Sequence, residues 1–212
     1  DSVGTIITRS DNAMYLAKND KTSNIAFYTD AVHQQLTHQM QVLEGIQEAL
    51  VEDQFFMHYQ PQFNHRQELI GVEALVRWQH SQLGLLLPDQ FIGLAEQYHR
   101  INEIGSWVID SVLSQVAQWH QAGYVLPKVA INISPIQLLD ENFSTIVNTL
   151  AVQYGINPER IVFEITESAD IEHFNLISTV LRDLKGQGYR FSLDDFGTGY
   201  SSMTHFKRLP FS

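Results

Sequence analysis

The sequence contains no cysteine, so disulfide bonds and thiolate metal sites are excluded and a reducing compartment is permitted. Long apolar runs are also lacking, and no stretch is long enough to cross a bilayer. The first residues show no basic region followed by an apolar run, so no signal peptide is expected. These absences leave a protein whose stability rests on an ordinary hydrophobic core.

Basic residues are scarce. Lys and Arg number 13 against 24 Asp and Glu, which gives a formal net charge of -11. This balance argues against DNA or RNA polymers as partners, because binding their backbones needs clustered basic side chains. A small phosphorylated ligand remains compatible, since cations held by carboxylates reverse the local field. The sequence also lacks a P-loop, a dinucleotide-binding glycine fingerprint, a nucleophile elbow and a His-Glu-x-x-His zinc motif.

The length of 212 residues and the 44% hydrophobic content fit one large domain, or a domain plus a fragment. Residues 10–19 predict a short helix and residues 25–28 a brief strand. Apolar residues then recur at helical spacing over 30–51. This helix is either a connector between domains or the first helix of the main domain, and the two interpretations are compatible.

The pattern changes after residue 52. Residues 55–60 predict a strand ended by Pro61, and 69–78 predict a second strand joined to it in an antiparallel hairpin. Helices are expected at 91–98 and 105–121.

Three strand–helix repeats follow this region. Their strands are expected at 128–134, 160–167 and 189–196, and their helices at 140–154, at 171–186 and from about Ser201. Such alternation indicates parallel strands with right-handed crossovers, so the predicted fold class is α/β. About five barrel-type strands are present, whereas a closed barrel needs eight. An open parallel sheet could end at Ser212, but a closed barrel could not.

Two adjacent carboxylates, Asp194 and Asp195, end an apolar strand and open directly onto a glycine-rich loop. Neighbouring strand residues point to opposite faces, so these two side chains cannot do the same work. Carboxylates in this setting suit a hard cation. The segment is equally good material for an ordinary turn, and the motif alone does not decide between the two.

Polar residues recur towards the carboxyl ends of the other strands. Glu73, Asn132 and Glu164 each stand where an apolar residue would be less costly. Each has an ordinary explanation: Glu73 could pair with Arg77, for example, and Asn132 could cap the following turn. Glu164 resists this most, because a buried carboxylate is costly unless it is paired or bound to metal. Four successive strands with this pattern favour a Mg²⁺ or Mn²⁺ site built from carboxylates and an amide oxygen.

With these residues in view, the chain from about residue 40 to 212 resembles the EAL domain, the family of cyclic di-GMP phosphodiesterases. The resemblance rests on five ordered motifs: Tyr59-Gln60-Pro61, Glu73-Ala74-Leu75-Val76-Arg77-Trp78, Asn132-Ile133-Ser134, Phe163-Glu164-Ile165-Thr166-Glu167-Ser168 and Asp194-Asp195-Phe196-Gly197-Thr198-Gly199-Tyr200-Ser201-Ser202. It implies a (β/α)8 TIM-like barrel of EAL type, present here as its first five or so strands, with one antiparallel strand pair near the start.

The resemblance also implies roles for individual residues. The positions that match metal-site residues of the family are Glu73, Asn132, Glu164, Asp194 and Asp195. Those that match contacts to the dinucleotide are Gln60, Leu75 and Arg77, and Glu167 matches a glutamate that braces the loop beginning at Asp195. Glu73, Glu164, Asp194, Asp195 and Glu167 are thus the expected catalytic residues. Two Mg²⁺ or Mn²⁺ ions would activate a water that opens cyclic di-GMP to linear pGpG.

The family completes its site with a lysine on the next strand and a glutamate on a later one, and both would fall beyond Ser212. Little catalysis is therefore expected from these 212 residues alone. The alternative hypotheses are a receptor that binds cyclic di-GMP without hydrolysing it, and an unclosed barrel without function.

The first segment is similar to the end of a GGDEF domain, through Asp11-Asn12-Ala13-Met14-Tyr15-Leu16-Ala17-Lys18 and Ala26-Phe27-Tyr28. The expected organisation is a GGDEF-like remnant at 1–29, a connecting helix at 30–51 and a truncated EAL domain at 52–212. The implied partners are cyclic di-GMP, upstream GGDEF and sensor domains, and a second copy of the chain, since the family often dimerises through the loop after Asp195. Cyclic di-GMP is intracellular, so the resemblance implies a cytoplasmic domain.

Overall fold

The computed structural model describes residues 27–124, 126–166 and 173–194, and near the start residues 3, 4, 7, 9, 10, 13 and 14. The chain divides into two compact units, residues 1–47 and 48–212. The helix predicted from about Ser201 lies outside the described residues. Among the residues described, we find no helix with the length and apolar character needed to cross a membrane.

The first unit is helical wherever its opening residues are described. Phe27 and Tyr28 form no strand, so the brief strand predicted there is wrong at these two positions, and its first half lies outside the described residues. Helix α2, Asp30–Val51, matches the predicted range. Thr29 caps this helix, because its hydroxyl oxygen accepts a hydrogen bond from the Val32 backbone N–H at 3.3 Å.

The second unit is built on a six-stranded sheet in the order β1-β2-β4-β5-β6, with β3 paired to β2. The strands are β1 Phe55–Phe63, β2 Leu69–His80, β3 Gly84–Leu86, β4 Val129–Ile133, β5 Ile161–Thr166 and β6 Arg190–Asp194. β2 pairs antiparallel with β1 and β3, whereas β2, β4, β5 and β6 pair in parallel. The predicted α/β class and the antiparallel pair near the start are therefore confirmed.

Strand β1 differs from the prediction at its end. It continues through Pro61, which lies opposite Val72, and stops at Phe63. β1 lies at one end of the described sheet, and an edge strand tolerates proline because one side of its backbone donates to no neighbour. The hairpin then turns on Asn64, whose side-chain oxygen accepts from the backbone N–H groups of Arg66 and Glu68 at 2.8 and 3.0 Å.

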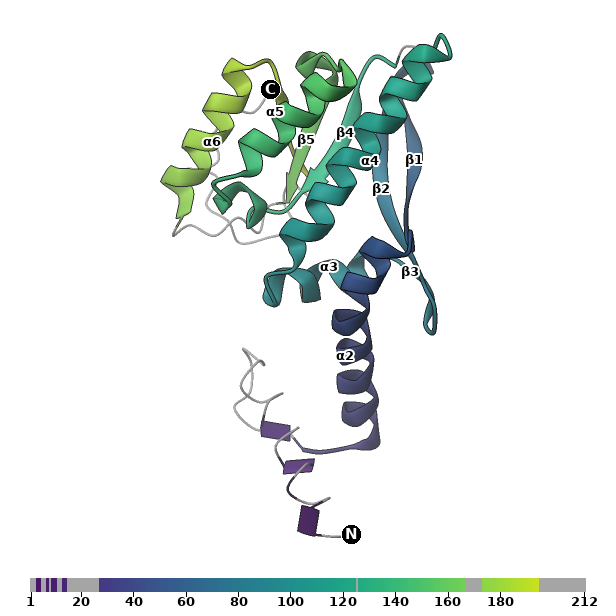
Figure 1. Cartoon of the computed structure of the whole chain (residues 1–212), viewed down its shortest axis with the longest axis vertical. Coiled ribbons are helices and arrows are strands. Elements are labelled where there is room, and N and C mark those ends of the chain that lie inside the picture. Colours follow the sequence, from purple (N-terminus) through teal and green to yellow (C-terminus); the bar gives the residue numbers. More distant parts are fainter. Residues whose placement is uncertain are drawn as a thin grey trace. The chain divides into compact units, whose positions relative to one another are not determined.

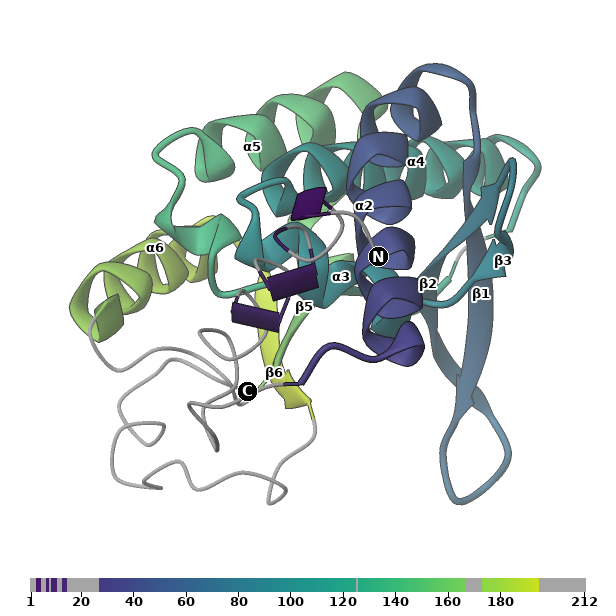
Figure 2. The same cartoon turned by 90° about the horizontal axis from the view of Figure 1, so that it is seen from below.

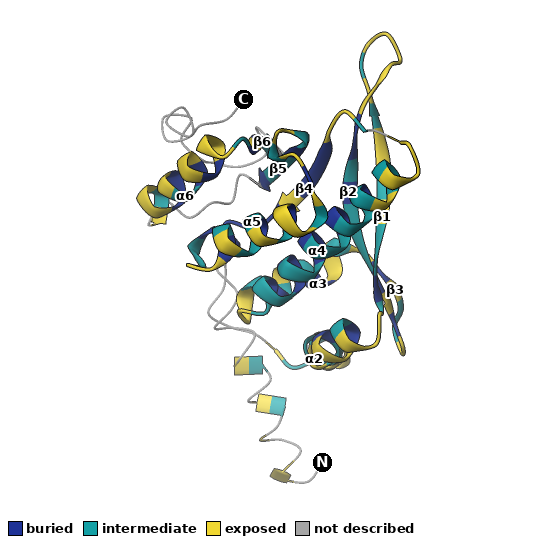
Figure 3. Ribbon diagram, turned by 45° about the horizontal axis from the view of Figure 1, so that its top comes forward, coloured by how far each residue is buried: buried dark blue, intermediate teal, exposed yellow. Residues whose placement is uncertain are grey.

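Helices cover one face of the sheet. α4 Ile101–Gln121, α5 Phe143–Tyr154 and α6 Phe174–Gly186 lie on the same side of the strands (Figures 1 and 2). Each turns a buried stripe inwards and an exposed stripe outwards (Figure 3). There are also two short 3-10 helices. One, η1 Gln137–Leu139, follows β4, and the other, η2 Pro158–Arg160, directly precedes β5.

The strands show which of their faces the helices cover. Val129, Ile131 and Ile133 of β4 are buried, whereas Asn132 between them is exposed. Alternate strand residues point to opposite faces, so the apolar set packs under the helices and Asn132 lies on the other face. We call this second face the open face. It carries every predicted site residue whose side chain is described.

An aromatic cluster fixes helix α3, Pro88–Gln97, to the hairpin strands. Phe91 of α3 is fully buried and lies with its ring centroid 5.5 Å from Trp78 and 5.8 Å from Phe55. The indole N–H of Trp78 donates to the side-chain oxygen of Gln54 at 3.1 Å. The cluster therefore ties the position of α3 to strands β1 and β2, which carry four of the nine expected site residues.

Candidate functional site

The register of the β1–β2 hairpin brings the first group of predicted residues together. Gln60 lies opposite Glu73, and Leu75 and Arg77 follow at alternate positions along β2. Residues directly opposite in an antiparallel pair project from the same face, and so do alternate residues of one strand. Gln60, Glu73, Leu75 and Arg77 therefore share the open face.

The parallel strands extend this row. Glu73 is in register with Ala130, two residues before Asn132 on the same face of β4. Asn132 is in register with Glu164 on β5, and Glu164 with Ser192 on β6. The sheet thus carries an amide, a carboxylate and a hydroxyl side by side on three neighbouring strands, close to their carboxyl ends.

A direct contact joins Glu73 to Asn132. The Asn132 side-chain nitrogen donates to Glu73 Oε1 at 2.8 Å, although 59 residues separate the two in sequence. Both ordinary explanations weighed for these residues are wrong: Arg77 donates to the Val76 carbonyl oxygen at 2.8 Å rather than pairing with Glu73, and it is the Ser134 hydroxyl that caps the turn after β4. Because the nitrogen end of the Asn132 amide is engaged, its oxygen end is the one available to a cation.

Glu164 is half-buried in the middle of the open face. The Ser192 hydroxyl donates to its Oε1 at 3.3 Å. This bond stabilises the ionised carboxylate and limits its rotation, which is useful for a group that binds a ligand. The sequence prediction that Glu164 needs a partner is consistent with this contact.

The remaining predicted residues are not all visible. Glu167 and Asp195 lie outside the described residues, and Asp194 is described only as the backbone end of β6, in register with Thr166. Among the described side chains, no three His, Cys, Asp or Glu groups gather into a possible metal cluster. The visible set is two carboxylates and one amide, all oxygen donors, and this donor chemistry fits a hard divalent cation.

A pocket of about 410 Å³ opens beside these residues. β2 and β4 are in register only from Val72 to Ala74 and from Val129 to Ile131, and the pocket lies next to the point where this pairing ends. Its lining comes from β2, β4, η1 and the helices α3 and α4: Glu73, Ala74, Leu75, Val76, Pro88, Asp89, Ile92, Gly93, Glu96, Ile101, Ile104, Gly105, Val108, Asn132, Ile133, Ser134 and Gln137. The pocket has a polar end at Glu73 and Asn132 and mostly apolar helical walls. Such a lining suits a ligand that has both a polar and an apolar part.

Sequence reasoning missed several residues of this region. His58 lies exposed opposite Leu75 on the open face, and the sequence alone assigned it no role in the site. Its alternation with Gln60 was the signal that could have placed it. Ser192 and Gln137 were missed because their partners, Glu164 and Ser134, depend on the sheet register and on a local turn.

Strand β1 also places a tyrosine on the helix side of the sheet. Burial raises the pKa of Tyr59 to about 12, and its ring packs edge-on against Trp119 with centroids 4.7 Å apart. Tyr59 neighbours Gln60 in sequence but points to the opposite face. It is therefore a half-buried packing residue that stays protonated, and it takes no part in the chemistry of the open face.

Comparison with known proteins identifies the family of the chain. A family model described as the EAL domain matches residues 43–212. The chain is 35% identical over 98% of its length to the bifunctional diguanylate cyclase/cyclic di-GMP phosphodiesterase MucR of Pseudomonas aeruginosa. It is 38% identical over 97% of its length to the cyclic di-GMP phosphodiesterase PdeR of Escherichia coli. The chain spans 30% of the first relative and 31% of the second, so it corresponds to about a third of their length.

A solved structure named PaMucR phosphodiesterase, c-di-GMP complex, is 37% identical to the chain, with a TM-score of 0.74 over 81% of this chain and 70% of that one. Structures of this family are TIM-barrel-like, and the family is generally dependent on divalent metal ions. The incomplete barrel predicted from the sequence is therefore confirmed. On the extent of the family match and the identity to these relatives, the chain belongs to the EAL domain family.

Proposed function

We propose that the protein hydrolyses cyclic di-GMP to linear pGpG in a reaction that depends on Mg²⁺ or Mn²⁺. The observation that carries this proposal is the open-face row, in which Glu73, Asn132 and Glu164 present oxygen atoms beside the pocket. The names of MucR and PdeR support the substrate, and the bound ligand named for the PaMucR structure supports it further.

The roles we propose follow from position on the open face. Glu73, Asn132 and Glu164 would hold the metal together with Asp194 and Asp195. Leu75 lines the pocket, and with Gln60 and Arg77 it would contact the dinucleotide, while Glu167 would brace the loop that begins at Asp195.

When bound, the metal would supply an activated water and withdraw charge from the phosphodiester group. The chain's own residues prepare that site. Glu73 fixes the Asn132 amide so that its oxygen is the free end, and Ser192 restrains the Glu164 carboxylate. In the net reaction, water adds to one phosphorus atom, the bond from phosphorus to the ribose 3′ oxygen breaks, and that oxygen takes up a proton. The apolar pocket walls limit the water around the ligand.

The first experiment is chromatographic. The protein is incubated with cyclic di-GMP and Mn²⁺, beside Glu73→Gln and the control Glu141→Gln, which changes an exposed carboxylate outside the pocket. Turnover by these 212 residues alone is expected to be low, so the incubation is long enough to detect slow release of pGpG. The parent and the control should release pGpG at the same rate, and Glu73→Gln should release it about 10- to 100-fold more slowly, since removing a metal ligand or its support typically costs that much. Equal turnover by Glu73→Gln would contradict the proposed metal site. Tight binding without any pGpG would favour the receptor hypothesis instead.

We further propose that residues 1–29 are the end of a GGDEF domain and that α2 connects it to the EAL domain at 52–212. Similarity to MucR and PdeR extends over 98% and 97% of the chain, whereas the family match begins at residue 43, and MucR is named as bifunctional. Upstream GGDEF and sensor domains, a homodimer and a cytoplasmic site of action belong to the same proposal. Sedimentation of the protein with and without cyclic di-GMP tests the dimer, and a monomer under both conditions would contradict it.

A further inference from the structure

We propose that Gln137, which lies in η1 outside the row of expected ligands, is a positioning residue that holds the proposed metal ligand Asn132 in place. This inference rests on the metal site proposed above. Gln137 acts through the backbone of the turn that follows β4, and helix α4 keeps its side chain in the required orientation.

Gln137 is a buried polar residue, with 4% of its surface exposed. Its side-chain oxygen accepts from the Ser134 backbone N–H at 2.9 Å, and its own backbone N–H donates to the Ser134 carbonyl oxygen at 3.0 Å. The Ser134 hydroxyl oxygen in turn accepts from the Ile136 N–H at 3.2 Å. Three hydrogen bonds thus hold Ser134, the first residue after β4.

The end of β4 needs this restraint. The register between β4 and β2 ends at Ile131 and Ala74, so Asn132 has lost its backbone partner on that side. Towards β5 the register continues to Ile133. Asn132 is therefore held by one neighbouring strand, by its own contact to Glu73, and by the turn that Gln137 closes two residues later.

Helix α4 sets the position of the Gln137 side chain. A Cβ atom added at Gly105 of α4 would overlap Gln137 Nε2 and would lie only 2.5 Å from Cδ. The absence of a side chain at Gly105 is what lets the amide fit with its oxygen towards Ser134.

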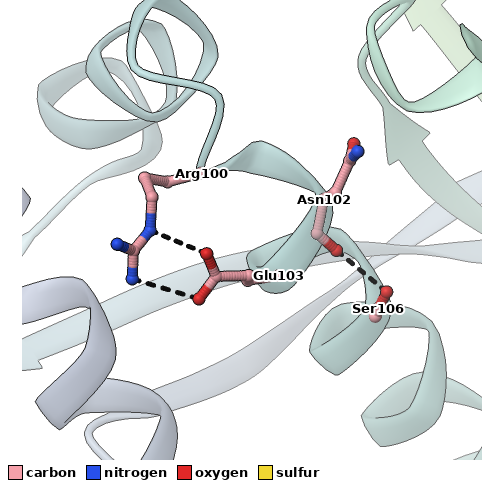
Figure 4. A network of polar contacts seen from close by, with 4 residues as sticks. All are labelled: Arg100, Asn102, Glu103 and Ser106. Atoms are coloured by element: carbon pink, nitrogen blue, oxygen red, sulfur yellow. Dashed lines mark hydrogen bonds and ion pairs between the residues drawn. The ribbon is translucent and has the colours of Figure 1, made fainter. Parts of the chain in front are cut away.

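The start of α4 is also tied to the segment that follows η1. Asn102 donates to Asp140 Oδ2, just beyond η1, at 3.1 Å. The first turn is further held by the ion pair of Arg100 with Glu103 at 2.7 Å and by the Ser106 hydroxyl, which donates to the Asn102 carbonyl oxygen (Figure 4). The hydrogen bond between Asn102 and Asp140 therefore holds α4 against η1. This contact keeps Gly105 next to the Gln137 amide and so limits how that amide can be oriented.

A residue that served only the general stability of the fold would behave differently from a positioning residue. Loss of its hydrogen bonds would lower the melting temperature but leave the affinity of the folded protein for metal unchanged. A positioning residue affects metal affinity in protein that is still folded, typically by about 10- to 100-fold.

The test compares three variants with the parent by direct Mn²⁺ binding, measured from the electron paramagnetic resonance signal of free Mn²⁺ without substrate. Gln137→Met keeps the side-chain length and removes the acceptor for Ser134. Gln137→Glu keeps that acceptor. Gly105→Ala leaves Gln137 itself unchanged but displaces its side-chain amide. Gly186→Ala on α6, where an added Cβ meets nothing within 4 Å, is the control for adding a methyl group to a helix.

We expect Gln137→Met and Gly105→Ala to raise the Mn²⁺ dissociation constant about tenfold or more, while Gln137→Glu and Gly186→Ala stay within about threefold of the parent. With Mn²⁺ saturating, the KM for cyclic di-GMP should change less than the Mn²⁺ concentration needed for half-maximal rate. Thermal unfolding of each variant identifies the folded samples.

Parental Mn²⁺ affinity in a folded Gln137→Met or Gly105→Ala would overturn the inference, and so would a loss of affinity in Gln137→Glu as large as in Gln137→Met. Failure of both Gln137→Met and Gly105→Ala to fold would overturn it too, since Gln137 would then serve the fold as a whole. The proposed function fails separately, if a parent that binds Mn²⁺ releases no pGpG. A parent that binds no Mn²⁺ refutes both.

Discussion

Replacing Asn132 with aspartate should destabilise the fold without metal, and a divalent cation should offset most or all of that loss. In the absence of metal, Asn132→Asp exchanges a hydrogen bond of 2.8 Å to Glu73 for two facing carboxylates. Two like charges about 4 Å apart repel by about 1 kcal/mol in water and about 4 kcal/mol at an effective dielectric constant of 20. Asn132 is exposed and Glu73 half-buried, so we expect a loss of about 1–3 kcal/mol in the free energy of unfolding.

With Mn²⁺ present, the same substitution adds a charged ligand to the site. Each tenfold gain in affinity stabilises the folded state by about 1.4 kcal/mol at saturating metal, which offsets most or all of the loss. Asn132→Ala is the matched control, because it removes the hydrogen bond and the oxygen donor without adding charge. Mn²⁺ should therefore stabilise Asn132→Asp more than the parent, and Asn132→Ala less.

Urea unfolding followed by tryptophan fluorescence, in EDTA and in Mn²⁺, measures these differences. The refuting result is an equal loss for Asn132→Asp under both conditions. That result would mean that no cation binds between Asn132 and Glu73, and that their contact serves only to join β2 to β4.

Further predictions concern the framework of the site. Phe91→Ala should cost about 3–5 kcal/mol in urea unfolding, because the ring is fully buried against two other aromatic residues, and Phe91→Leu should cost less than half of that; similar values for both would argue against tight packing of α3. Burial raises the pKa of Tyr59 and of Tyr189 to about 12 from an ordinary 10.0, so both phenols favour the folded state below about pH 10, and stability should fall as pH rises from 10 to 12; tyrosinate absorbance in which every tyrosine of the folded protein ionises near pH 10 would contradict this. Tyr154→Phe should cost about 1 kcal/mol, because its hydroxyl donates to Asp110 at 2.9 Å between α5 and α4, and no loss in thermal unfolding would show that contact to be energetically neutral.

The sequence was sufficient to predict the helices that show a long, regular pattern of apolar residues. The helix at 30–51 was predicted at its observed bounds, and α4 begins at Ile101, four residues before the predicted start. β3 was missed because its three residues are too short to show an alternation. Pro61 was read as the end of a strand because the sequence does not say whether a strand lies at the edge of a sheet, where proline is tolerated.

The candidate site was predictable as a set of residues but not as a set of contacts. The sequence placed Glu73, Asn132 and Glu164 towards the carboxyl ends of their strands, and the register of the sheet puts all three on one face. The suggested pairing of Glu73 with Arg77 was wrong, because Glu73 accepts a hydrogen bond from Asn132 instead. Arg77 is near in sequence, whereas Asn132 comes from another strand through the register of the sheet. Contacts of this kind depend on how distant strands align, which local sequence does not determine.

One side of the pocket is formed by strands and the other by helices. The residues that would hold the metal and the residues that would shape the rest of the ligand site can therefore change independently in evolution. The polar end belongs to the sheet, where a shift of β2 or β4 would disturb several strands at once. The helical side belongs to α3 and α4, and Ile92 and Gly93 of α3 contribute to the lining. Substitutions at these helical positions can change which ligand is accommodated while the acidic groups stay as they are. A lineage could in this way acquire a new ligand preference, or lose turnover and keep binding, through a few independent mutations.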